Sequence, residues 1–281
     1  MNVNLGICNF AVPGTGVFAP RIVSEMGLDG MSLELGSYQH GWPLSLRKLQ
    51  NFYLEEQQKY GIEYANIGCS DGDNIPFFAR ENEPINKVIK EWVTKAVDTA
   101  DYMKIPMVFF ANFNASCVTS EEDLVYTAKR YRDICDYAAD KGIEISCECP
   151  LSVKQQLQLV DMVERKNFSL FYDSNNYSYF TNYDQVEVLK GIYPHMGKQL
   201  HVKDSTKDCL ANAVLGTGVS NFHGSIEFLK QQNYEGWLIL ENLYELESMR
   251  HLDEDYFEIM RADIKALREA VKYTEKLEKL S

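Results

Sequence analysis

Short runs of β-forming residues alternate with amphipathic helical windows along the whole chain of 281 residues. This alternation is typical of parallel strands, because each parallel strand needs a long return connection, which is usually a helix. The expected strands are Asn4–Asn9, Gly30–Leu35, Glu63–Ile67, Met107–Ala111, Ile143–Cys149, Phe168–Asp173, Gln199–Lys203 and Trp237–Glu241. Eight such strands predict an α/β fold, a closed (β/α)8 TIM barrel. Such barrels commonly have roughly 250 residues, which favours a single domain over residues 1–281.

Helical windows between the strands carry start and stop signals. The clearest windows are Leu46–Tyr60, Ile85–Met103, Glu121–Lys141 and Val153–Arg165. Ser120 and Ser152 precede two of them and are expected to cap their first turns. Glycines at 27, 61 and 142 stand where helices should end, since the left-handed terminal position favours glycine. A charged window from Asp253 to Leu280 is expected to form the last helix.

The charge and the cysteines of the chain indicate which binding partners and which cellular compartment to expect. The chain has 41 acidic against 28 basic residues, and its net charge of −13 would repel a nucleic-acid backbone. No window approaches the ~20 uninterrupted apolar residues of a membrane span, and no export leader is expected. Seven scattered cysteines favour a reducing compartment over a disulfide framework. We therefore expect a cytoplasmic protein without nucleic-acid or membrane partners, and a homo-oligomer is compatible with the sequence.

The last four strands each end in a side chain that can bind a metal. In the fifth strand, Ile145 and Cys147 share the outward face, and Glu148 lies on the inward face at the end. The same alternation turns Asp173, His201 and Glu241 inward at the ends of the next three strands. Strand ends converge at the C-terminal mouth of a barrel, where active sites of this architecture lie.

Three carboxylates at one mouth would repel one another unless a cation or protons neutralise them. A single divalent metal ion bound by Glu148, Asp173, His201 and Glu241 would meet this need. Three oxygen donors and one imidazole suit Mn²⁺, Mg²⁺, Co²⁺ or Zn²⁺, and the lack of thiolates argues against a structural zinc site. Mn²⁺ or Mg²⁺ is favoured.

Several segments along nearly the whole chain match a known pattern in order and spacing. They are Ile145-Ser-Cys-Glu148, Phe171-Tyr-Asp173, His201-Val-Lys-Asp204, Leu215-Gly-Thr-Gly218 ahead of Asn221-Phe222, and the run from Tyr234 to Glu241. Together they resemble the xylose isomerase-like TIM barrels. That family includes sugar phosphate isomerases and epimerases and shares its barrel with the apurinic-site endonucleases.

The resemblance to ketose 3-epimerases of this family implies roles for the four residues. It implies that Glu148, Asp173, His201 and Glu241 bind one metal ion, and that the two glutamates also move the proton. A metal that chelates a carbonyl and the adjacent hydroxyl would stabilise the enediolate formed on proton loss. Return of the proton to the opposite face would be an epimerisation, and return to the neighbouring carbon an isomerisation. Both remain open.

Five further residues are candidate contacts to a small carbohydrate substrate. Asn176 stands where many relatives have a histidine, and it can form hydrogen bonds but cannot carry a proton. Lys203 and Glu34 face inward, and each has either a substrate contact or a structural role. His40 and Trp42 lie in the loop after the second strand, where they could cover the mouth and stack on a sugar or pack the loop itself.

Other functions remain as alternatives. An inosose dehydratase-type lyase or a hydroxypyruvate-type isomerase would use a related site, and a non-catalytic sugar-binding barrel is a more remote alternative. A nuclease would need histidines at the third and fourth strand ends, where Gly68 and Asn112 stand. Backbone N–H groups around Gly216 and Gly218 could bind a phosphate or form a tight turn, so phosphorylated and free sugars both stay open.

Overall fold

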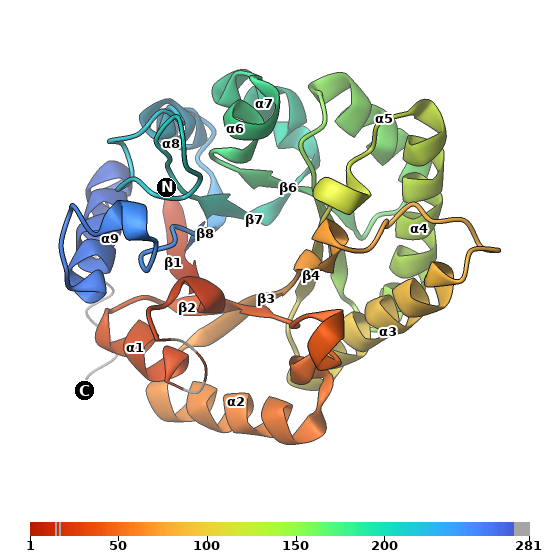
Figure 1. Cartoon of the computed structure of the whole chain (residues 1–281), viewed down its shortest axis with the longest axis horizontal. Helices are drawn as coiled ribbons and strands as arrows, with labels where there is room; N and C mark the ends of the chain where they lie inside the picture. Colours follow the sequence, from red (N-terminus) through yellow and green to blue (C-terminus); the bar gives the residue numbers. More distant parts are fainter. Residues whose placement is uncertain (15, 17, 273–281) are drawn as a thin grey trace.

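The computed structural model, which describes residues 1–14, 16 and 18–272, contains a closed barrel of eight parallel strands. Each strand pairs with the next, and β1 pairs with β8. The strands are β1 (Asn2–Cys8), β2 (Gly30–Glu34), β3 (Glu63–Cys69), β4 (Met107–Ala111), β5 (Glu144–Glu148), β6 (Phe168–Asp173), β7 (Met196–Val202) and β8 (Glu235–Leu240). Figure 1 shows the strands at the centre and the helices around them. The predicted (β/α)8 class is confirmed.

Helices form the outer layer. They are α1 (Ala19–Glu25), α2 (Arg47–Tyr60), α3 (Ile85–Met103), α4 (Glu121–Ala139), α5 (Val153–Val163), α6 (Asn176–Thr181), α7 (Gln185–Ile192), α8 (Phe222–Gln231) and α9 (Tyr256–Val271). Both predicted caps are confirmed, because Ser120 and Ser152 each accept the backbone N–H three residues ahead. The three expected glycine stops all have positive φ. None of the helices in the described part of the chain is long and apolar enough to cross a bilayer.

Some predicted boundaries were wrong. Helix α5 ends at Val163, two residues early, because Glu164 already adopts a left-handed backbone. Helix α4 ends at Ala139, also two residues early. Strand β7 begins at Met196, where it pairs with Leu170, and β3 continues to Cys69. Pairing with a neighbouring strand, which local composition does not show, therefore sets several strand ends. Residues 273–280 of the expected last helix lie outside the described residues.

The barrel interior changes in character along its axis. Toward the N-terminal ends of the strands it is polar, and the Asn66 side-chain amide donates to Oε1 of the Gln199 side chain at 2.7 Å. Further along, the rings of Phe109 and Phe171 stack at 4.5 Å, and both contact the His201 ring edge-on. Phe109 and Phe171 are 4% and 0% exposed. A buried aromatic floor therefore lies against the mouth of the barrel.

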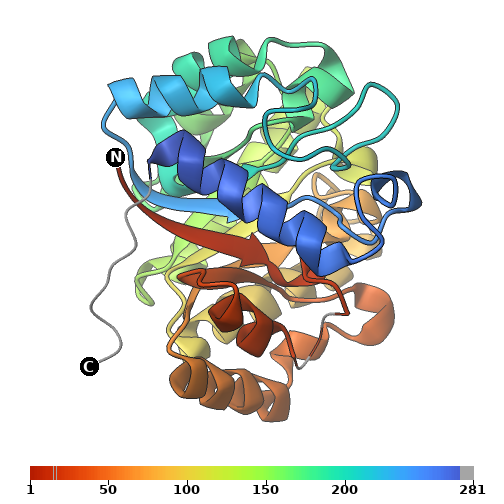
Figure 2. The same ribbon diagram turned by 90° about the vertical axis from the view of Figure 1, so that its left-hand side faces the viewer.

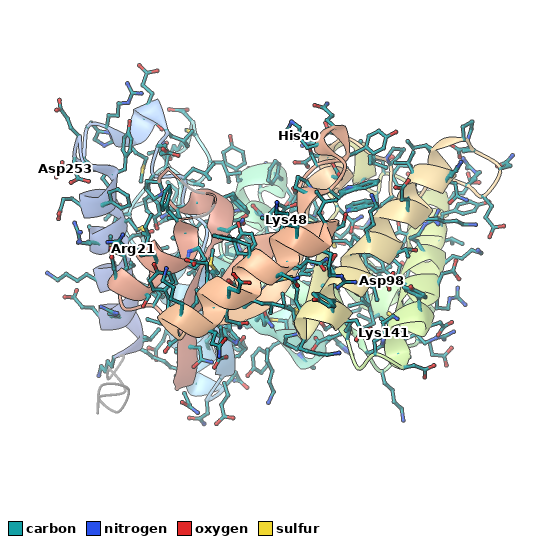
Figure 3. All side chains as sticks on the ribbon, turned by 90° about the horizontal axis from the view of Figure 1, so that it is seen from below. Arg21, His40, Lys48, Asp98, Lys141 and Asp253 are labelled. Carbon is teal, nitrogen blue, oxygen red and sulfur yellow. The ribbon has the colours of Figure 1, made fainter. Side chains whose placement is uncertain are left out.

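The C-terminal ends of the strands and their loops gather at one end of the molecule, as the side view in Figure 2 shows. In Figure 3, His40 in the loop after β2 lies near this end, and Lys141, just before β5, lies near the other. In barrels of this kind the active site is formed by the loops at the C-terminal ends of the strands.

The long loop between β7 and α8 is organised around one carboxylate. Asp204 accepts backbone N–H groups from Ser205, Gly216, Gly218 and Ser220 at 2.9 to 3.1 Å. The N–H groups at Gly216 and Gly218 are therefore already bonded to an internal anion. The phosphate site considered there is not available, and the turn interpretation is correct.

Replacing Asp204 by alanine should lower the free energy of unfolding by more than about 2 kcal/mol, because four backbone N–H groups lose their acceptor. The exposed neighbour Asp208 provides the control, and Asp208→Ala should change stability by less than about 0.5 kcal/mol. Urea denaturation of both variants measures the difference. Equal midpoints would show that Asp204 does not hold this loop.

Candidate metal centre

Four ligand-type side chains converge at the C-terminal mouth. Glu148 is the last residue of β5, Asp173 is the last residue of β6, His201 lies near the end of β7, and Glu241 directly follows β8. One ligand atom from each lies within 4.8 Å of the others. The structure thus brings together the four residues that the sequence singled out.

Strand pairing explains why these side chains meet. Asp173 and His201 are direct partners in the β6–β7 ladder. The Glu241 N–H continues the pairing by bonding to the Val202 carbonyl at 3.1 Å. Since successive strand residues point to opposite faces, this register turns all these ligand groups to the inside.

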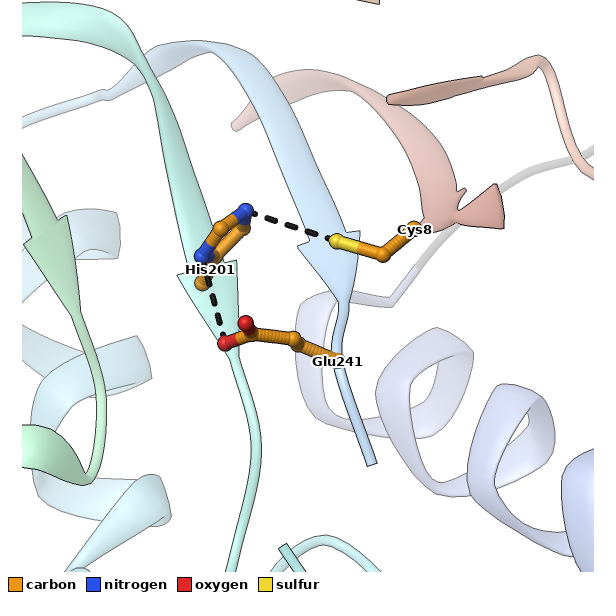
Figure 4. A group of neighbouring side chains, drawn as sticks. All are labelled: Cys8, His201 and Glu241. Carbon is orange, nitrogen blue, oxygen red and sulfur yellow. Dashed lines mark hydrogen bonds and ion pairs between the residues drawn. The ribbon is translucent and has the colours of Figure 1, made fainter. Parts of the chain in front are cut away.

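His201 has both ring nitrogens directed at polar groups. Its Nδ1 lies 3.2 Å from Glu241 Oε2 and 3.6 Å from Glu148 Oε1. Its Nε2 lies 3.5 Å from the Cys8 sulfur. Figure 4 shows the two sides of the ring joined to Cys8 and to Glu241 by dashed lines. Burial by itself would lower the pKa of His201, but Glu241, Cys8 and Glu148 together hold that pKa well above its usual value. The imidazole is therefore buried and faces the negative charge of the neighbouring glutamates.

Lys203 forms a buried ion triad with two of the acids. Its Nζ lies 2.5 Å from Glu241 Oε2 and 3.3 Å from Asp173 Oδ2. Burial opposes the ammonium, yet these carboxylates raise the pKa of Lys203 above its ordinary value. Burial likewise opposes ionisation of Glu241, but His201 and Lys203 hold the Glu241 pKa well below its ordinary value. Lys203 is thus salt-bridged inside the barrel, one of its two expected roles.

Asp173 is fixed by the first residues of the following loop. Its Oδ1 accepts the backbone N–H groups of Asn175 and Asn176 at 2.8 and 2.7 Å. Burial, with smaller contributions from the charges of Glu241 and Glu148, raises the pKa of Asp173 to about 7 against the opposing effect of Lys203. The backbone thus holds one carboxylate oxygen and leaves Oδ2 directed at the cluster.

The donor set fits a divalent cation. Asp173 Oδ2 and His201 Nδ1 are buried and form no hydrogen bond, and their neighbours Lys203 Nζ and Glu241 Oε2, at 3.3 and 3.2 Å, contact them as ion-pair partners only. Three carboxylates and the Lys203 ammonium sum to a formal charge of −2 when His201 is neutral, as a metal ligand must be. One divalent ion would balance that charge and could coordinate both of these atoms.

Two other candidate contacts have internal partners. Asn176 Nδ2 donates to Glu148 Oε1 at 2.8 Å, so this side chain touches a candidate ligand. Glu34, at the end of β2, is not part of the four-residue cluster. Its Oε1 accepts the N–H and O–H of Ser70 at 3.1 and 2.9 Å. Burial raises the pKa of Glu34 to about 7, and the Ser70 donors oppose this.

The two loop aromatics differ in exposure. The Trp42 indole N–H donates to Asp71 at 2.6 Å, and the Lys95 ammonium lies 4.7 Å from the ring centroid. Trp42 is 1% exposed, so its ring packs the loop and presents no face to a sugar in this structure. His40 is exposed, with Nδ1 3.2 Å from the Ser37 hydroxyl.

Sequence reasoning missed two residues of the mouth. Cys8 lies on the inward face of β1, together with Asn4 and Gly6, whereas the buried Leu5 and Ile7 face outward. The alternation of residues along this strand could therefore have predicted that Cys8 points into the barrel. Asp73, in the turn after β3, accepts the Asn114 amide at 3.0 Å. Burial raises the Asp73 pKa, and the charges of Glu148 and Lys203 also act on it. No sequence pattern marked that position.

Comparison with known proteins yields relatives over nearly the full chain. A 2-epi-5-epi-valiolone 7-phosphate 2-epimerase from Actinoplanes sp. is 22% identical over 245 residues, which cover 87% of this chain and 88% of the relative. The crystal structure of D-allulose 3-epimerase from Methylomonas sp. in complex with D-allulose has a TM-score of 0.76 at 18% identity, covering 96% of this chain and 97% of that one.

The IOLI protein, crystallised with a bound zinc atom, has a TM-score of 0.75 at 16% identity and covers 97% of this chain and 99% of its own. The structural likenesses show a shared fold. The family model described as the xylose isomerase-like TIM barrel matches residues 20–276. Since this match spans most of the sequence and agrees with the observed barrel, the chain belongs to the xylose isomerase-like TIM barrel family.

Proposed function

We propose that this protein is a divalent-metal-dependent isomerase or epimerase of a small sugar, sugar phosphate or polyol-derived ketone. The observation that carries the proposal is the convergence of Glu148, Asp173, His201 and Glu241 within 4.8 Å. The Actinoplanes and Methylomonas relatives, both epimerases by name, support the same class of reaction. Mn²⁺ and Mg²⁺ suit the oxygen-rich donor set, and Co²⁺ and Zn²⁺ are the alternatives.

The residues divide into holding and proton-moving roles. When bound, the metal would polarise a substrate carbonyl and stabilise the negative charge that develops on its oxygen. Glu148 and Glu241 would remove the proton from the adjacent carbon and return it. Asp173 and His201 would hold the ion, and the aromatic floor of Phe109 and Phe171 would exclude water below it.

The two glutamates have unlike surroundings, as an acid and base pair requires. Glu241 faces the Lys203 ammonium at 2.5 Å and is held ionised. Glu148 instead accepts the neutral amide of Asn176 at 2.8 Å. Because Asn176 cannot itself take a proton, it would position Glu148 without competing for the transferred proton.

Replacing Glu148 or Glu241 by glutamine should lower turnover by about 10²- to 10⁴-fold, because each variant loses a positioned proton-transfer group. Turnover is measured by NMR in D₂O, as deuterium incorporation and product formation on a panel of ketoses, ketose phosphates and inososes with Mn²⁺.

Glu144→Gln is the matched control, since Glu144 lies on the same inward face at the opposite end of β5, bonded to Ser169. It should keep near-normal turnover. Water loss from an inosose would reassign the protein as a lyase. Deuterium exchange that persists in both Glu148→Gln and Glu241→Gln would contradict the proposed roles.

Metal binding gives an independent prediction. Titration with Mn²⁺ should show one ion per chain, and Asp173→Asn and His201→Ala should each weaken its binding by more than about tenfold, as each loses a coordinating atom. Asp73→Asn is the control, because it removes a carboxylate near the mouth that is outside the cluster. Undiminished Mn²⁺ binding in both ligand variants would rule out this metal site.

A further inference from the structure

Cys8, the last residue of β1, contacts the ring nitrogen of His201 that does not face the candidate ligands. Its sulfur lies 3.5 Å from Nε2, as the dashed line in Figure 4 marks. The other ring nitrogen, Nδ1, lies 3.2 Å from Glu241 and 3.6 Å from Glu148. Cys8 and His201 are 0% and 1% exposed. One buried ring thus has a sulfur on one side and carboxylates on the other.

The register of three strands places Cys8 at this position. Ile239 of β8 pairs with His201 of β7 on one side and with Gly6 of β1 on the other. Cys8 follows Gly6 by two residues, so it lies on the same inward face, nearer the mouth. The contact between Cys8 and His201 is therefore set by the paired strands of the barrel and does not depend on the conformation of a loop.

The Nε2 atom of His201 needs an acceptor when the ring binds a metal. A neutral imidazole that coordinates through Nδ1 carries its proton on Nε2, and a buried N–H group nearly always has a partner. The rings of Phe109 and Phe171, which also contact this imidazole, hold no oxygen or nitrogen that could accept. Within residues 1–14, 16 and 18–272, the one hydrogen-bond partner of Nε2 is the Cys8 sulfur.

Cys8 lies beside the metal centre and is not one of its four ligands. Its sulfur is within 4.8 Å of ligand atoms of His201 and Glu241, but the group that contains Glu148 and Asp173 does not include it. Histidines that bind metals almost always donate their second ring N–H to a carboxylate, a carbonyl or water, and this bond fixes the tautomer and the orientation of the ring. In this protein a sulfur stands in the place of that acceptor.

We propose that Cys8 is a positioning residue for the metal centre. Its sulfur accepts the Nε2–H of His201 and so holds the ring with Nδ1 turned toward the other three ligands. The inference rests on the proposed function for the presence of a bound metal ion. The placement of the sulfur against Nε2 stands on the strand register and on the burial of both side chains.

The test is a calorimetric titration of chelator-treated protein with Mn²⁺. Cys8→Ala should weaken Mn²⁺ binding by about tenfold or more, because the buried Nε2–H loses its acceptor. Cys8→Ser should restore most of the affinity, since a hydroxyl can accept the same bond. Cys69→Ala is the matched control, because Cys69 is also a buried cysteine at the end of its strand and belongs to neither group of candidate ligands. It should lower the unfolding midpoint and keep the wild-type affinity for Mn²⁺.

Wild-type affinity in Cys8→Ala would overturn the positioning role, as would an equal loss in Cys69→Ala or a failure of Cys8→Ser to restore binding. The absorption spectrum of the Co²⁺-loaded protein separates positioning from ligation. A thiolate-to-metal charge-transfer band that disappears in Cys8→Ser would make Cys8 a ligand and would also overturn the role. Mn²⁺ binding that depends on Cys8, in a protein that exchanges no substrate proton, would contradict only the proposed function. Turnover with Mn²⁺ affinity unchanged in Cys8→Ala would contradict only the role of Cys8.

Discussion

Negative charge buried at the barrel mouth is the constraint on which the site depends. Glu148, Asp173 and Glu241 are carried by the ends of three strands, where the backbone cannot move them apart. Crowding of carboxylates away from water is unfavourable unless each finds a partner. Lys203 balances part of this charge, and without a metal ion the same carboxylates raise the pKa of His201 and favour its protonated form. A divalent cation that took the place of the His201 proton would complete the balance, next to Asp173 Oδ2 and His201 Nδ1.

Much of this arrangement follows from local sequence. Alternation in the fifth strand turns Glu148 inward because Ile145 and Cys147 must face the helices, and the same period places Asp173, His201 and Glu241. The capped helix starts at Ser120 and Ser152 are equally local, since donor and acceptor are three residues apart. Features that depend only on residues close together in the chain, such as these, can therefore be predicted from the sequence.

The remaining features depend on partners distant in the chain. Trp42 is turned into its loop by Asp71, 29 residues away, and no local pattern announces that bond. The glycine turn at 216 and 218 is filled by Asp204, which the sequence alone does not distinguish from an exposed acid. Met196 joins β7 because Leu170 pairs with it. The ion-paired state of Lys203 likewise required knowing how β6, β7 and β8 approach one another.

The stacked rings of Phe109 and Phe171 limit how a ligand can reach the barrel interior. Both rings are buried against His201, so they fill the lumen below the four candidate metal ligands. Access to these ligands is then from the C-terminal mouth alone. Whatever enters must leave by the same opening. Under the proposed function, an ion at the bottom would lie beneath a sugar placed over it, so the cation would bind before the sugar and leave after it.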